Sequence, residues 1–245
     1  MRKNEIFRSY PIFSTIITTF VTAEISLTTL VVTGVGSVRI EQYSAICLAC
    51  LFSLLFLTHD PRNVATFVAL AMTVLADTFF VICRPMLKLP AMLAFSVVQL
   101  AYFMRLLRNI PNKRRKYHIV LRAAFILFGE GFIVCFLQRN VDALVIVSVH
   151  YYVNILLNCV MSWTEIRESR LFALGLLLFV CCDTLIGLKA ASEVYLTLPH
   201  VFDFLFSTEI NLPWLFYIPS QTLIALSVAQ LVKNRHLAPV KTQNG

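Results

Sequence analysis

The sequence predicts an all-α membrane protein, a polytopic bundle of eight transmembrane helices with both termini in the cytoplasm. Its composition is the first reason: hydrophobic residues make up 58% of the chain and charged residues only 14%, whereas soluble domains are about one-quarter charged. The second reason is that the apolar stretches approach the roughly 20 residues of helix that span a bilayer. The third is the uneven distribution of lysine and arginine between the two sides of the predicted bundle.

Eight apolar stretches separated by short polar connections define one predicted transmembrane domain over residues 1–245. The first stretch follows a basic start but is too long for the apolar region of a typical signal peptide, so we expect a retained helix. The second stretch is the shortest. The one longer connection, about 189–211, has apolar residues at near-helical spacing, and we expect it to lie on the membrane surface. The predicted helices cover roughly 12–33, 43–58, 64–83, 90–107, 119–138, 142–163, 171–188 and 212–232.

The charge distribution predicts the orientation of these helices. With eight spans, 15 lysine and arginine residues fall on the side of both termini and five on the other. This bias places the termini in the cytoplasm. The basic run from Lys113 to Lys116 is then a topology determinant that also suits contact with anionic lipid. The net charge of +8 is explained in this way, and we expect no nucleic-acid partner.

The seven cysteines do not indicate a disulfide framework or a metal centre. Six fall inside predicted helices, and Cys83 lies at a helix end. Cys47 and Cys50 have the spacing of a metal or redox motif, but no further cysteine or histidine lies near them in the sequence. Packing as small apolar side chains is the better interpretation, and we expect no cofactor.

The most informative residues are two aspartates, Asp77 and Asp183, inside apolar helical stretches. An ionisable group in the bilayer core costs about 2.5–3.5 kcal/mol on insertion scales, so such groups generally serve a function. The other two helices that run outward from the cytoplasm carry Glu24 and Glu130 at a similar distance from their predicted starts. Acids at one depth can converge on one polar chamber, which is what we expect here.

The inward-running helices supply uncharged polar partners for these acids. In lipid such groups turn toward the protein interior, so we expect a cavity lined by the third, fourth, sixth, seventh and eighth helices. Pro219 lies between two of the polar residues and can open space by bending the last helix. Bridging between helices is the alternative role for each single residue, and for His150 packing is the favoured role. The candidate positioning residues are Gln99, Tyr102, Tyr151, Asn154, Tyr217 and Gln221.

These residues resemble the motifs of the YhhN-like integral membrane family, whose characterised members are lysoplasmalogenases. The resemblance covers about residues 64–232, and Gln99, Ala76 and Cys182 stand where the family favours histidine, glycine and serine. Arg39 is a loose candidate for the family's lysine near the second helix. The matching segments are Ala76-Asp77, Gln99-Leu-Ala-Tyr102, Tyr151-Tyr152-x-Asn154 through Met161-Ser162-Trp163, Gly175-x-x-x-Phe179, Cys182-Asp183-Thr184 and Tyr217-Ile-Pro-Ser-Gln221.

The resemblance implies hydrolysis of the vinyl ether bond of a lysoplasmalogen, which gives a fatty aldehyde and a glycerophospho-base. An enol ether is hydrolysed by protonation of its vinyl carbon and addition of water to the resulting oxocarbenium ion. Two close carboxyls sharing one proton can act as acid and base in such a reaction. We therefore predict that Asp77 and Asp183 form a catalytic dyad. No metal is required, and the lysophospholipid enters sideways from the bilayer.

Two other classes of function stay open at this stage. Intramembrane acids also serve as proton relays, and the even 53-residue spacing of the four acids together with Pro219 is compatible with a small proton-coupled transporter. A non-catalytic lipid-binding protein is the other alternative, favoured if the two aspartates face different neighbours. A homodimer is compatible with either class, and the membrane is a bacterial cell membrane or the endoplasmic reticulum.

Overall fold

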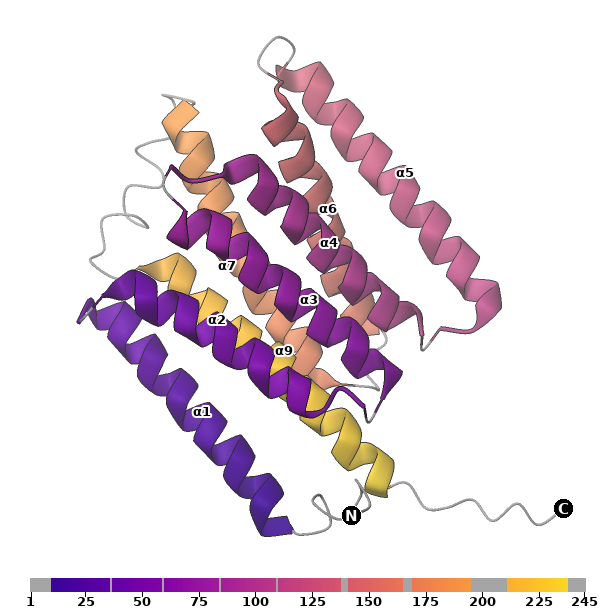
Figure 1. The fold of residues 1–245 in the computed structure, drawn as a ribbon. Coiled ribbons are helices and arrows are strands. Elements are labelled where there is room, and N and C mark those ends of the chain that lie inside the picture. The colour runs from indigo at the N-terminus through magenta and orange to yellow at the C-terminus, as the bar shows by residue number, and fades with distance from the viewer. Residues whose placement is uncertain are drawn as a thin grey trace, which may run out of the picture.

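The computed structural model describes residues 10–35, 37–58, 60–83, 85–108, 110–137, 141–164, 169–194 and 211–237, and within them every element is helical (Figure 1). In these residues, eight helices are long and apolar enough to cross a membrane, which confirms the predicted all-α architecture of eight apolar helices. They are α1 (Tyr10–Thr33), α2 (Val38–Leu55), α3 (Pro61–Asp77), α4 (Lys88–Leu107), α5 (Asn112–Leu137), α6 (Ala143–Thr164), α7 (Arg170–Val194) and α9 (Leu212–Leu237), with a π-helical turn, η2 (Thr78–Ile82), after α3.

The helices form a bundle whose interior is made by α3, α4, α7 and α9. α7 packs along α9, α3 packs along α4, and α6 joins α4 to α7. α1 and α5 lie at opposite edges of the bundle (Figure 1), where α1 contacts α2 and α9 and α5 contacts α6. Aromatic and aliphatic side chains such as Phe56, Tyr102, Phe179 and Ile224 are fully buried between these helices.

Several helix boundaries differ from the predicted ones. α2 is displaced toward the N-terminus, because Ser37 precedes a first turn in which Glu41 accepts a hydrogen bond from the Ser37 N–H at 3.1 Å. α5 begins at Asn112, so the basic run from Lys113 is helical rather than a loop. α7 continues to Val194. The connection expected on the membrane surface lies mostly outside the described residues.

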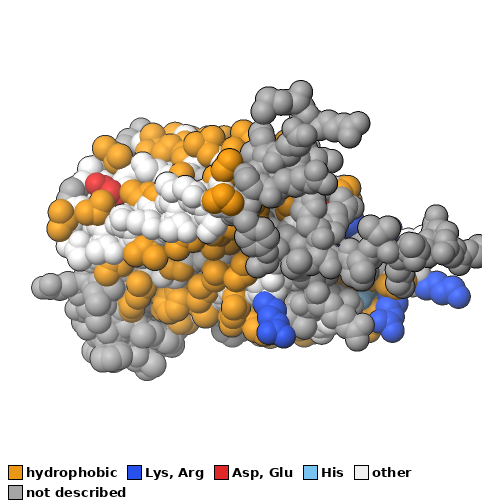
Figure 2. All heavy atoms as spheres, turned by 90° about the horizontal axis from the view of Figure 1, so that it is seen from below, with side chains coloured by type: hydrophobic (Ala, Val, Ile, Leu, Met, Phe, Trp, Pro, Cys, Tyr) orange, Lys and Arg blue, Asp and Glu red, His pale blue; other side chains and the backbone are white. Residues whose placement is uncertain are grey.

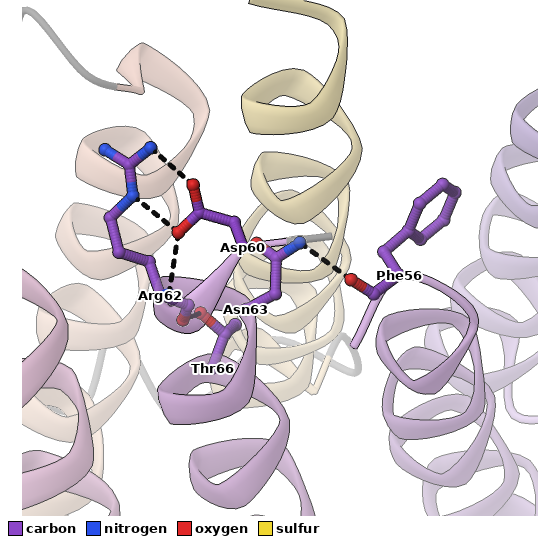
Figure 3. A network of polar contacts seen from close by, with 5 residues as sticks. All are labelled: Phe56, Asp60, Arg62, Asn63 and Thr66. Atoms are coloured by element: carbon purple, nitrogen blue, oxygen red, sulfur yellow. Dashed lines mark hydrogen bonds and ion pairs between the residues drawn. The ribbon is translucent and has the colours of Figure 1, made fainter. Parts of the chain in front are cut away.

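The turn between α2 and α3 illustrates how polar residues end helices at the edge of the bundle (Figure 3). Asp60 caps α3 by accepting from the Arg62 N–H at 2.8 Å, and Pro61 occupies the first helical position, where its missing N–H costs nothing. The Arg62 guanidinium returns two hydrogen bonds to the same carboxylate at 2.9 and 2.8 Å. Asn63 donates to the Phe56 carbonyl at 2.8 Å, which joins the two helix ends.

Large apolar side chains cover the outer surface of the helices (Figure 2). On α5, for example, Leu127 and Phe128 are 70% and 72% exposed. Lysine and arginine side chains gather toward one end of the face seen in Figure 2 rather than along the apolar band. An apolar belt around helices of this length is the surface of a multi-pass membrane protein.

Candidate functional site

One cavity of about 640 Å³ opens within the bundle, at the end where α3 and α7 finish and α2, α4 and α9 begin. Its size lies within the roughly 300–1,000 Å³ that is usual for small-molecule sites. α1 begins and α9 ends at the opposite end of the bundle (Figure 1). Side chains from α3, α4, α6, α7 and α9 line the cavity, which confirms the predicted set of helices and adds α2 to it.

Asp77 and Asp183 both line this cavity. Asp77 is the last residue of α3, immediately before η2, and is 3% exposed. The predicted helix over 64–83 continues through this position, whereas the structure changes from α-helix to π-helix immediately after Asp77. Asp183 comes from α7. The structure thus places both aspartates in the wall of one cavity.

Each aspartate accepts a hydrogen bond from a tyrosine of another helix. The Tyr217 hydroxyl of α9 donates to Asp77 Oδ2 at 2.8 Å. The Tyr151 hydroxyl of α6 donates to Asp183 Oδ2. Both tyrosines also line the cavity. Two carboxyl–tyrosine pairs, built from four different helices, are therefore held in one chamber, and each pair retains oxygen lone pairs for a further partner.

The rest of the cavity wall is mainly apolar and aromatic. Phe80, Met92 and Trp214 contribute to it. Phe95 and Tyr217 also line it, and both rings pack against Phe179 behind the wall, at 6.2 and 5.5 Å between ring centroids. An apolar pocket with a few convergent polar groups suits an elongated, mostly apolar ligand with one polar reacting centre.

Arg39, at the start of α2, carries the single lysine or arginine side chain among the described residues that line the cavity. It is exposed and lies at the end of the bundle where the cavity is formed. The sequence offered only a loose signal for Arg39, its position just before the second apolar stretch. Gln42, one turn further along α2, is buried in the same wall and carried no signal of its own.

Four predicted positioning residues do not line the cavity: Gln99, Tyr102, Asn154 and Gln221. All four are buried. Asn154 donates to the His150 carbonyl at 2.8 Å, and the Tyr102 ring packs edge-on against Phe172 at 5.4 Å. These residues belong to a deeper layer of the bundle, one or more helical turns farther from the cavity end than Tyr151 and Tyr217.

Arg122 of α5 organises part of that deeper layer. Its guanidinium donates to Asn154 Oδ1 at 2.6 Å and to Asn158 Oδ1 at 2.5 Å, and lies 3.7 Å from the centre of the Phe103 ring. Arg122 was not among the candidate residues, because it lies near the start of the fifth apolar stretch and was left out of the charge count. The positive charge of Arg122 inside an apolar stretch could have identified it, because a charged group inside a span generally has buried partners.

Glu24 and Glu130 do not join the two aspartates, contrary to the expectation of one chamber for all four acids. Glu24 of α1 is 2% exposed and lies outside the cavity wall. Glu130 of α5 pairs with His150 Nδ1 of α6 at 3.0 Å. The reason is the position of their helices, because α1 and α5 form the two edges of the bundle. His150 is half-exposed and engaged in this pair rather than packed in the core.

Within the described part of the chain, no three histidine, cysteine, aspartate or glutamate side chains come close enough together to hold a metal ion. All seven cysteines are free thiols. The titratable side chains that line the cavity are those of Arg39, Asp77, Tyr151, Tyr152, Cys182, Asp183 and Tyr217.

Comparison with known proteins identifies the family of the chain. Searches of the curated proteins and of the solved structures each found no match. A family model, that of the YhhN family, matches residues 41–228. This range includes both aspartates and their two tyrosine partners, with α3, α4, α5, α6 and α7 whole and most of α2 and α9. Because the match covers most of the sequence, the chain belongs to the YhhN family.

Proposed function

We propose that this protein is a lysoplasmalogenase-like hydrolase, which cleaves the vinyl ether bond of a lysoplasmalogen to a fatty aldehyde and a glycerophospho-base. The observation that carries the proposal is the joint presence of Asp77 and Asp183 in one cavity, each bound by a tyrosine hydroxyl. The apolar wall suits the alkenyl chain. Arg39, at the same end of the bundle, suits the phosphate of the headgroup.

The chemistry requires one proton donor and one proton acceptor beside the double bond. A carboxylic acid of the pair protonates the vinyl carbon that is not bonded to oxygen, and the π electrons of the double bond form the new C–H bond. The positive charge is shared between the neighbouring carbon and the ether oxygen, where a carboxylate stabilises it. Two carboxyls that hold one proton between them supply both groups.

Water completes the reaction. Its oxygen adds to the cationic carbon, and the carboxylate accepts its proton. The hemiacetal then loses its hydroxyl proton as the carbon–oxygen bond to glycerol breaks, and the glycerol oxygen takes up a proton. The products are the aldehyde and the glycerophospho-base, and the carboxyl pair regains its single proton. Tyr151 and Tyr217 hold the two carboxyls in place during these transfers.

The test uses purified protein with a lysoplasmalogen and with an ester lysophospholipid, and measures free aldehyde. We expect aldehyde from the first substrate only. Asp77→Asn and Asp183→Asn should each lower the rate by about 100- to 10,000-fold, the usual contribution of a general acid or base. Near wild-type rates in both folded variants would refute the role of the pair.

Asp142→Asn is the matched control for these variants. Asp142 is exposed before α6, where its Oδ1 accepts from the Val145 N–H at 2.8 Å, and asparagine can accept the same hydrogen bond. Its rate should stay at the wild-type value. A proton-coupled carrier would instead release no aldehyde and would move a solute across proteoliposomes, with a dependence on the same two aspartates.

A further inference from the structure

Three buried polar atoms lie beneath the cavity without a hydrogen-bond partner in the described part of the chain. They are Gln99 Nε2, Tyr102 Oη and Gln221 Oε1. Gln99 and Tyr102 are 0% exposed and Gln221 is 1% exposed. Leaving such groups unpaired inside a protein is unfavourable, and most buried polar groups have a partner in the protein or in ordered water.

A chain of hydrogen bonds that starts at Arg122 determines which way the side-chain amides of Asn158 and Gln99 point. A guanidinium has only donors, so the Asn158 oxygen faces Arg122 at 2.5 Å. The Asn158 nitrogen must then face Gln99, where it donates to the backbone carbonyl at 2.9 Å and to Oε1 at 3.0 Å. The Gln99 side-chain nitrogen is consequently turned away from Asn158, with two hydrogens to donate.

Gln221 presents the complementary group. Its side-chain nitrogen approaches the Ser220 hydroxyl at 3.3 Å, which leaves its oxygen as an acceptor without a partner in the described residues. Tyr102 adds a hydroxyl that can both donate and accept. One donor, one acceptor and one hydroxyl are the set that a single buried water molecule satisfies, since such waters typically make about three hydrogen bonds.

Two hydrogen bonds relate the heights of residues on α9 to those on α4 and on α3. α4 and α9 run in the same direction, and Arg105 Nη1 donates to Ser227 Oγ at 2.8 Å. Gln99 and Gln221 each precede those residues by the same number of positions. The second bond joins Tyr217 to Asp77 at 2.8 Å, and Gln221 lies one helical turn, about 5.4 Å, below Tyr217.

α3 supplies a fourth group at this depth. α3 runs opposite to α9. Thr73 lies one turn before Asp77, and Gln221 lies one turn after Tyr217. Because Tyr217 bonds Asp77, Thr73 and Gln221 lie at the same level. Thr73 is 0% exposed. Its hydroxyl donates to the Ala69 carbonyl at 3.0 Å and keeps lone pairs that can accept from water.

We infer that Gln99, Tyr102 and Gln221 form an internal water site between α4 and α9, one helical turn beneath the floor of the cavity. The site holds water because all of its groups are neutral and because Arg122, through Asn158, fixes which atoms donate and which accept. These residues thus stabilise the packing of the helices through water rather than contacting a ligand in the cavity. The inference does not depend on the proposed catalytic function.

X-ray hydroxyl-radical footprinting of the folded protein in oxygen-18 water tests this site, because radicals form from the water that lies beside a side chain. We expect Tyr102 to be labelled several-fold more than Phe56, although both are 0% exposed. Phe56 is the protected control, since it packs among aromatic rings of α1 and α2. Labelling of Tyr102 no higher than that of Phe56 in the wild-type protein would overturn the inference.

A double variant gives the second measurement. Gln99→Leu with Gln221→Leu removes the donor and the acceptor, and should reduce the labelling of Tyr102 to the level of Phe56. Gln230→Leu is the matched control, because Gln230 lies on the same helix but bonds Ser169, at 2.8 Å. Unchanged labelling in a folded double variant would contradict the site. If that variant does not fold, the wild-type comparison decides alone.

Discussion

Gly175 of α7 allows a close approach to α9, and both helices carry site residues, so replacing Gly175 with alanine tests the packing. A Cβ atom built at Gly175 would lie 2.7 Å from Ile224 Cγ1, 3.0 Å from the Ser220 carbonyl oxygen and 3.1 Å from the Ile224 nitrogen. Two of these three atoms belong to the backbone of α9, so a change of side-chain rotamer cannot relieve the contact.

The expected cost follows from two opposing effects. Overpacking a filled core costs about 1–3 kcal/mol, and backbone contacts place Gly175→Ala in the upper part of this range. Alanine regains up to about 1 kcal/mol over glycine in a helix interior. Gly131→Ala on α5 should gain the same helix-propensity stabilisation without a steric clash, because nothing lies within 4 Å of the Cβ position there. The difference between the two variants therefore isolates the packing cost.

Thermal unfolding with a thiol-reactive dye measures this difference, since Cys159 and Cys182 are 7% and 2% exposed and react only when the bundle opens. For a chain of this size about 1 kcal/mol corresponds to roughly 2–4 °C, so Gly175→Ala should melt roughly 4–12 °C below Gly131→Ala. A melting temperature for Gly175→Ala equal to or above that of Gly131→Ala would refute the close α7–α9 contact.

Three further substitutions test other contacts. Tyr217→Phe removes the donor to Asp77 and should lower the rate of aldehyde release by about 10- to 100-fold, while Tyr117→Phe, at an exposed position, should leave it unchanged. Arg122→Met leaves two buried amide oxygens without their donor and should reduce the free energy of unfolding by about 2–4 kcal/mol, measured by chemical denaturation. Asp60→Ala removes the cap of α3 and should cost about 1 kcal/mol in the same measurement, whereas Asp60→Asn, which keeps an acceptor, should cost less.

The fold was predictable because lipid imposes one simple rule on every span. A stretch of apolar residues must form its backbone hydrogen bonds internally, so length and hydropathy suffice to find all eight helices. Boundaries were less predictable, since they depend on caps and on polar helix ends. The first turns of α5, from Asn112, are basic and lie outside the apolar stretch, yet they continue the helix.

The sequence allowed prediction of those site residues whose side chains are ionisable and yet lie in apolar helices, but not of the others. Asp77 and Asp183 stood out because a carboxyl is costly in an apolar helix, and both line the cavity. Gln99 and Gln221 carry similar polarity but lie in another layer. Their helices start within two residues of the predicted starts, so this error concerns the position of the cavity along the helices, which depends on how the helices pack. Arg122 was missed because its partners, two asparagines of α6, are found only by packing.

The position of the cavity has a consequence for how this protein can be studied in cells. Among the described residues, α1 begins and α9 ends at one end of the bundle, and the cavity lies at the other end. A tag placed before α1 or after α9 therefore reports the face opposite to the cavity, whichever way the protein is inserted. Protease accessibility of such a tag in sealed vesicles would reveal which leaflet the cavity faces.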